Sequence, residues 1–100
     1  MNVTLPAERF NAAVSDGSVG PTIRAILDEI KPEAAYFTEQ DGHRGAILIV
    51  DVPEPSRIPS LAEPWFLKFN ATVNFRIIMS AEELAHANLE ALGRKWAAAS

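Results

Sequence analysis

The stretch YFTEQDGHRGAILIVDV, Tyr36 to Val52, decides the fold of this chain. Two strand-like runs flank the dipeptide Asp41-Gly42, a strong signal for a tight β-hairpin turn. The predicted elements are a strand over 33–39, a turn over 40–43 and a second strand over 44–52. The second strand contains Ala46 to Val50, a run without a polar side chain. A strand with apolar groups on both sides needs cover on both faces of its sheet.

Composition predicts one folded domain over residues 1–100. Hydrophobic residues make up 48% of the chain and charged residues 22%, which excludes a disordered protein. No apolar run approaches the roughly 20 residues that span a bilayer, and the N-terminus carries no export signal. We therefore expect a soluble, cytoplasmic bacterial protein with no membrane partner. The net charge of −4 argues against nucleic acid, and the absence of cysteine excludes disulfides and thiolate metal sites.

The first third of the chain predicts a short strand followed by two helices. Residues Asn2 to Leu5 have a strand pattern that ends at Pro6. Phe10, Ala13 and Val14 fit one or two helical turns. A second helix has Pro21 in its first turn and ends before Pro32. Its apolar stripe follows the i, i+3, i+4, i+7 spacing and consists of Ile23, Ile26, Leu27 and Ile30.

After the hairpin, the pattern predicts a kinked helix, a strand and a last helix. The kinked helix has Ser56 as its cap, Pro59 in its first turn and Pro64 inside it. Its apolar stripe is Ile58, Leu61, Ala62, Trp65, Phe66 and Phe69. The alternating strand runs from Ala71 to Met79. Ser80 and Glu83 form a capping box that opens the last helix. That helix carries its apolar stripe at Ala85, Leu89, Leu92 and Trp96.

This order, β-α-β-β-α-β with an added C-terminal helix, predicts an α+β ferredoxin-like sandwich with an antiparallel sheet. Both crossover helices lie on one face of such a sheet, and its first and third strands lie in the middle. The central run Ala46 to Val50 would then expose apolar side chains on the face without helices. A second copy of the chain is the simplest cover, so we predict a homodimer through the open sheet faces.

The chain resembles the dimeric α/β-barrel superfamily, in which two ferredoxin-like sheets pack face to face. The hairpin segment EAAYFTEQDGHRGAILIVDV and the segment LAEPWFLKFNATVNF are similar to those of a group of small bacterial proteins in that superfamily. The resemblance spans essentially the whole chain, but these segments contain no catalytic motif. It implies a dimer with an interior cavity. Members include cofactor-independent monooxygenases, muconolactone-type isomerases, haem-dependent proteins and ligand-sensing domains, so the fold does not select a reaction.

Alternation along the strands selects the residues of the predicted cavity. In the last strand, Val73, Phe75, Ile77 and Met79 form the apolar set, which we expect against the helices. The opposite face then carries the ligand-binding candidates Arg76, Asn74, Thr72, Thr4 and Tyr36, together with Asn2 and Thr38. These polar groups either form a wet rim between two copies or line a half-apolar cavity. In the second case Arg76 would hold a small anionic or carbonyl-containing ligand.

Other candidates carry weaker signals. His43, beside the turn, is the only catalytic candidate, as a general base, and a solvated loop residue is the alternative. Glu82, His86 and Glu90 have the spacing of a metal chelate, but a polar outer helix face explains them better, so no metal site is predicted. Trp65, Phe66 and Phe69 fit the core by their spacing, and an aromatic ligand shelf is the alternative.

The sequence leaves two classes of function open. RGAILIVD has the position of an RNA-recognition motif, but Ala46, Leu48 and Asp51 replace its stacking aromatic residues, so RNA binding is rejected. Phosphate-loop, dinucleotide and nucleophile motifs are absent, and no cofactor is predicted. A homodimeric small-molecule-binding protein, with or without monooxygenase- or isomerase-like activity, is favoured. The alternative is a non-catalytic ligand-sensing or protein-interaction module. Whether the chain is an enzyme stays open.

Overall fold

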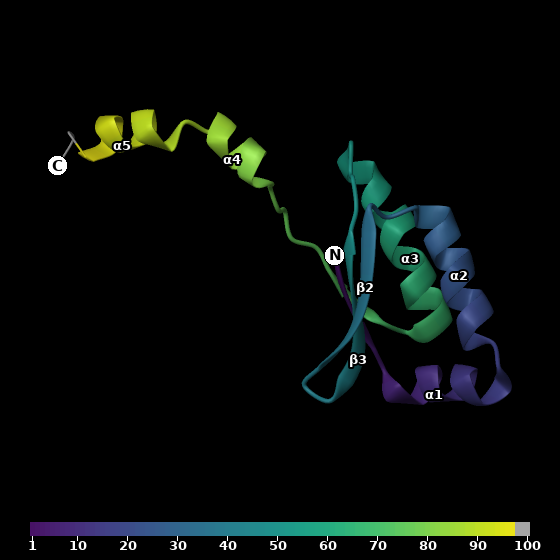
Figure 1. Cartoon of the computed structure of the whole chain (residues 1–100). Helices are drawn as coiled ribbons and strands as arrows, with labels where there is room; N and C mark the ends of the chain where they lie inside the picture. Colours follow the sequence, from purple (N-terminus) through teal and green to yellow (C-terminus); the bar gives the residue numbers. More distant parts are fainter. Residues whose placement is uncertain (98–100) are drawn as a thin grey trace.

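The computed structural model describes residues 1–97 (Figure 1). These residues form a four-stranded sheet, three main-body helices with a short 3-10 turn, and a C-terminal arm. The strands are β1 (Asn2–Leu5), β2 (Ala34–Gln40), β3 (His43–Ile49) and β4 (Thr72–Asn74). The helices are α1 (Ala7–Asp16), α2 (Val19–Ile30), the short 3-10 turn η1 (Pro55–Arg57), α3 (Ile58–Phe69), α4 (Ala81–His86) and α5 (Leu89–Ala97).

The sheet is antiparallel throughout, with the strand order β2-β3-β1-β4. As predicted, β1 and β3 occupy the middle, so the α+β class is confirmed and the arrangement is compatible with a ferredoxin-like fold. Figure 1 shows α2 and α3 side by side on one side of this sheet. The other side, which we call the open face, is covered by no helix among the described residues.

The core lies between the sheet and the helices. Its fully buried side chains are Trp65, Phe69, Leu5, Leu48 and Val3. Val3 pairs with Ala46 on β3 and with Val73 on β4, so one face of three adjacent strands is apolar. The stripe of α3 meets this face through Leu61, Trp65 and Phe69. The apolar stripe of α2 contributes one buried residue, Ile26.

The hairpin turn is built by two residues with positive φ. Asp41 has φ 54° and Gly42 has φ 80°, which are the left-handed values that a two-residue turn of the tight primed type requires. The Glu39 carboxylate accepts a hydrogen bond from the Gly42 N–H at 2.7 Å. β3 is shorter than predicted, because residues 50–52 leave the sheet for the loop before η1.

Helix α3 contains Pro64 inside it, as predicted, and differs from the prediction at its start and on its surface. Ser56 does not cap the helix, because its hydroxyl donates instead to the Glu54 carboxylate at 3.0 Å. Arg57 occupies the cap position without a capping side chain. The prediction that Phe66 lies in the core is wrong, because it is 39% exposed. The side of α3 that faces the sheet buries Leu61, Ala62, Trp65 and Phe69, and Phe66 lies at the edge of that side.

The predicted strand over 71–79 is wrong beyond Asn74. Asn2, the first residue of β1, pairs with Asn74, so β1 offers no partner to the residues that follow. Residues 75–80 have no regular structure, and Ile77 is 95% exposed. Phe75 and Met79 are exposed too, so the expectation that they pack against the helices with Val73 is also wrong. Val73 itself packs against the core.

The last helix is two helices, and its apolar stripe is not buried. Ser80 and Glu83 form the predicted capping box at the start of α4. Asn88, with φ 53°, then breaks the helix before α5. Residues 75–97, which we call the arm, begin beside the end of the sheet, and α4 and α5 lie away from the main body (Figure 1). The radius of gyration is 18.2 Å. A compact chain of this length has about 13 Å.

Candidate functional site

The open face collects the polar residues that alternation selected. The register sets Asn2 opposite Asn74 and Thr4 opposite Thr72 on the outer pair of strands. It also sets Asn2 opposite Ile47, and Ile47 opposite Tyr36. Residues paired across an antiparallel sheet share a face. The predicted ligand-binding residues on β1, β2 and β4 therefore lie on one surface, and Ile47 lies among them.

This surface is divided into a polar half and an apolar half. The polar half is formed by β1 and β4. In the apolar half, Tyr36 is 63% exposed and Ile47 is 43% exposed, while Ile49 is half-buried. Gly45 lies between Thr4 and Thr38 in the register, and a Cβ at this glycine would stand 3.0 Å from the Val3 carbonyl oxygen. The glycine thus keeps the centre of the open face flat.

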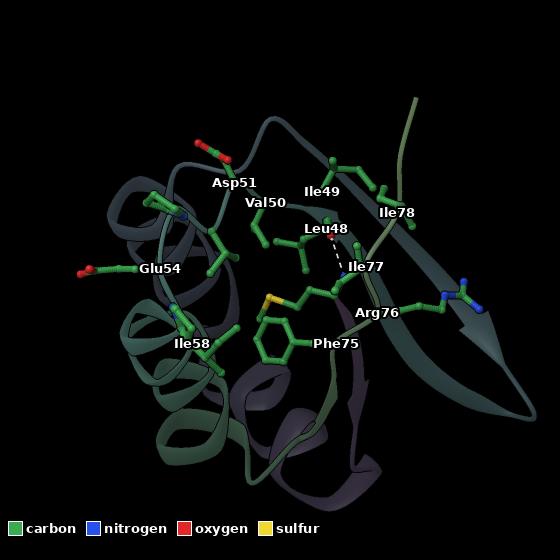
Figure 2. Close-up of a pocket in the computed structure, with 14 residues that line it drawn as sticks. Leu48, Ile49, Val50, Asp51, Glu54, Ile58, Phe75, Arg76, Ile77 and Ile78 are labelled. Atoms are coloured by element: carbon green, nitrogen blue, oxygen red, sulfur yellow. Dashed lines mark hydrogen bonds between the residues drawn. The ribbon is translucent and has the colours of Figure 1, made fainter. Parts of the chain in front are cut away.

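Arg76 stands beside the polar half, two residues past Asn74. Figure 2 shows its side chain extending away from Phe75, Ile58 and the other labelled apolar side chains. It is exposed, and it forms no ion pair with a carboxylate in the described part of the chain. Glu39 and Asp51 are the carboxylates that a strand could present to Arg76, and neither forms an ion pair with it. Glu39 instead accepts the hydrogen bond from the Gly42 N–H, and Asp51 lies on the loop after β3.

A cavity of about 510 Å³ opens next to Arg76, at the end of the sheet. Its walls come from the end of β3 and the loop after it, from the start of α3, and from the first residues of the arm. The side chains of Val50, Ile58 and Phe75 point into it (Figure 2). Sequence reasoning missed this cavity, because it assigned residues 50–52 and 75–79 to strands.

The α-amino group of Met1 lies in the wall of the cavity. It donates a hydrogen bond to the Leu48 carbonyl oxygen at 3.0 Å, and the Leu48 N–H donates to the Met1 carbonyl oxygen at 2.9 Å. Burial lowers the pKa of this amine from its ordinary value of 8.0, and the positive charge of Arg76 lowers it further. The same positive potential favours an anion at this end of the sheet.

His43 does not lie beside Arg76. It pairs with Gln40 next to the turn, four residues along β3 from Ile47. Four strand residues correspond to about 13 Å. Its neighbour Arg44 points to the other face of the sheet. There it donates to the Asn11 side-chain oxygen at 2.6 Å, and its guanidinium lies 4.6 Å from the centre of the Phe10 ring. Arg44 thus fastens α1 to the hairpin, a role that the sequence pattern did not indicate.

Two weaker alternatives from the sequence are not supported. Glu82 and His86 belong to α4 and Glu90 to α5, on either side of the break at Asn88, and within residues 1–97 no three such side chains could hold a metal ion. Glu90 forms a long ion pair with Arg94 at 3.9 Å instead. Of the three aromatic rings considered for a ligand shelf, Trp65 and Phe69 are fully buried and Phe66 alone is partly exposed, so they form no shared shelf.

Comparison with known proteins yields no match among family models, curated proteins or solved structures. In the described part of the chain, every helix is too short or too polar to cross a membrane.

Proposed function

We propose that the chain binds a small anionic or carbonyl-containing molecule on the open face of its sheet, as a homodimer in which a second copy covers that face. Arg76 carries this proposal. It is an exposed guanidinium without a carboxylate partner in the described part of the chain, next to Asn74 on a half-apolar surface. A guanidinium in a partly dry space requires a carboxylate, carbonyl groups, water or an anion.

The chemistry of the surface suits a ligand with two unlike ends. The guanidinium can hold a carboxylate with two parallel hydrogen bonds, and the hydroxyls and amides of Thr72, Asn74 and Asn2 add further donors. Tyr36 and Ile47 offer an apolar surface to the rest of the molecule. Covering this surface with a second copy would remove water from it and strengthen the polar contacts.

The arrangement favours binding over catalysis. His43 is the proposed general base, but about 13 Å of strand separates it from Ile47, and Arg76 lies beyond the polar residues that pair with Ile47. A small molecule held by Arg76 does not reach the His43 imidazole on the same copy. A monooxygenase- or isomerase-like reaction would therefore require the second copy to supply the acid–base group.

The test replaces the charge of Arg76 while keeping its bulk. Sedimentation at micromolar concentration comes first and should show two chains. A panel of small carboxylates and ketoacids is then screened by thermal shift, and each hit is measured by calorimetry. Arg76→Met should lose binding of the hits while the chain stays folded. Arg24→Met is the matched control, because Arg24 is exposed on α2, on the other side of the sheet.

Three outcomes would oppose the proposal. A clean monomer would leave the apolar half of the open face uncovered and refute the homodimer. Equal binding by Arg76→Met and Arg24→Met would place the ligand elsewhere. Loss of the dimer in Arg76→Met, with no hit from the screen, would make Arg76 an interface residue. That last result would favour the alternative, a non-catalytic interaction module, which the exposed apolar side chains of the arm also support.

A further inference from the structure

We infer that the arm, residues 75–97, is a clasp that docks on the body of the second copy, so that two chains exchange arms. This inference rests on the homodimer of the proposed function and adds a second contact region to it. Two observations carry it: the direction in which the arm leaves the sheet, and the apolar side chains that it exposes.

The arm leaves on the side of the sheet that a second copy would occupy. In Figure 1, α2 and α3 lie on one side of the sheet, and the segment after β4 runs out on the opposite side, toward α4 and α5. The molecule consequently measures 63 Å along its longest axis and only 28 and 20 Å along the others. A second copy placed against the open face would meet this arm, and twofold symmetry would make the contact reciprocal.

Apolar side chains are exposed along most of the arm. Leu89, Leu92 and Trp96 follow the spacing i, i+3, i+7 on α5 and so share one side of that helix. Trp96 is 66% exposed. The other exposed apolar side chains of the arm are Phe75, Ile77, Ile78, Met79, Leu84, Leu89 and Leu92. Isolated helices of this length are marginal in water, so α4 and α5 need a surface to pack on.

Charge selects a second copy over a lipid surface. The described arm carries three basic residues, Arg76, Arg94 and Lys95, and three acidic ones, Glu82, Glu83 and Glu90. Helices that bind anionic membranes are rich in Lys and Arg on the polar side, and the whole chain has a net charge of −4. Docking on a second copy of the chain does not require an excess of basic residues. The open face of that copy presents Tyr36, Ile47 and Ile49 on the side where the arm leaves.

Trp96 provides the measurement. The chain contains two tryptophans, and Trp65 is fully buried in the core, so Trp65→Phe makes Trp96 the sole reporter. Its emission and its acrylamide quenching are followed over a dilution series together with sedimentation. If Trp65→Phe folds poorly, the spectrum of Trp96→Phe is subtracted from that of the parent chain to give the same signal.

The clasp predicts that Trp96 is shielded in the dimer and becomes exposed on dilution, at the concentration where the dimer dissociates. Exposed Trp96 in an intact dimer would overturn the clasp and leave the homodimer standing. Shielded Trp96 in the monomer would overturn it as well, because the arm would then pack on its own chain. A monomer at all concentrations would refute the clasp and the proposed function together. If anionic vesicles shield Trp96 from acrylamide while the chain stays monomeric, the arm binds lipid and the inference is overturned.

Substitutions on the arm give a second readout. Leu92→Gln should weaken dimerisation by about tenfold or more, because each dimer buries two copies of that leucine. Thermal unfolding of the dilute monomer should stay unchanged, since Leu92 does not pack against the core. Glu82→Gln on α4 is the matched control and should leave the dimerisation constant unchanged. Equal dimerisation constants for the two variants would contradict the clasp.

Discussion

Trp65→Ala tests whether the packing of α3 on the sheet holds the body together. Trp65 is fully buried, with its ring 6.1 Å from that of Phe69, which in turn lies 5.5 Å from the ring of Phe10. Trp65 thus supports Phe69 on the same helix, and Phe69 makes the ring contact with Phe10 that connects α3 to α1. Truncating a buried tryptophan to alanine costs about 3–5 kcal/mol, through lost transfer energy and the cavity left behind.

The lower end of that range is expected here. The Trp65 Nε1–H is buried and has no hydrogen-bond partner among the described residues. An unsatisfied buried donor costs about 1–3 kcal/mol, and the substitution removes that penalty together with the ring. We therefore expect a loss of about 3 kcal/mol for Trp65→Ala. Trp65→Phe, which keeps an aromatic ring and removes the donor, should lose roughly 1 kcal/mol, by the same principles.

Urea denaturation followed by circular dichroism measures both losses. With a slope of about 1.5 kcal/mol per molar, the midpoint of Trp65→Ala should fall by about 2 M. Trp96→Ala is the matched control. It should change the free energy of unfolding of the dilute monomer by less than about 0.5 kcal/mol, because Trp96 is mostly exposed. A loss of unfolding free energy below about 1 kcal/mol for Trp65→Ala would show that α3 does not pack on the sheet as described. The cavity lined by the start of α3 would then be misplaced as well.

Two further predictions concern the turn and the end of α1. Gly42→Ala should lower the free energy of unfolding by about 1 kcal/mol, because a φ of 80° is strained for alanine. Gly20→Ala, inside α2, should raise it slightly, because alanine favours the helix. Equal effects of the two substitutions in urea denaturation would contradict the turn geometry. Hydrogen bonding to the Ser18 side chain, together with the bond from the Ser18 N–H at 2.9 Å, lowers the pKa of the Asp16 carboxyl below 3.8. Its contribution to stability is therefore present above pH 3.8 and is lost as the pH falls through the lower pKa of the folded state. In a pH series of melting temperatures, Asp16→Asn should show a weaker acid dependence than the parent chain, and an identical dependence would refute this role.

Local patterns were sufficient to predict most of the body. The hairpin follows from Asp41-Gly42, since few residue pairs adopt two positive φ angles in succession. The stripe of α3 follows from the 3.6-residue period, and Pro64 did not override it because burial of Trp65 and Phe69 outweighs one lost hydrogen bond. The strand order was predictable because right-handed crossovers leave few alternatives.

Contacts between distant segments were not predictable in the same way. Arg44 stands between His43 and Gly45 beside the turn, and nothing local indicates that it meets Asn11 and Phe10. The amino group of Met1 enters the cavity wall only because β1 lies beside Leu48. The polar side of the open face was predictable, since alternation needs only the strand itself. The cavity was not, because it forms beyond the ends of β3 and β4, where the chain leaves the sheet.

The incorrect strand beyond Asn74 is informative about the proposed dimer. Alternation records which side chains a strand would bury, and it does so whether the covering surface comes from the same chain or from another. Phe75, Ile77 and Met79 keep the apolar alternation of β4, yet within one chain β1 offers them no partner and their side chains are exposed. A single chain thus does not bury the apolar side chains that this pattern sets on one face. Two chains that exchange arms would bury it, and they would also cover Tyr36 and Ile47 on the open face. One assembly would then account for both exposed apolar surfaces, and it would enclose Arg76 between them.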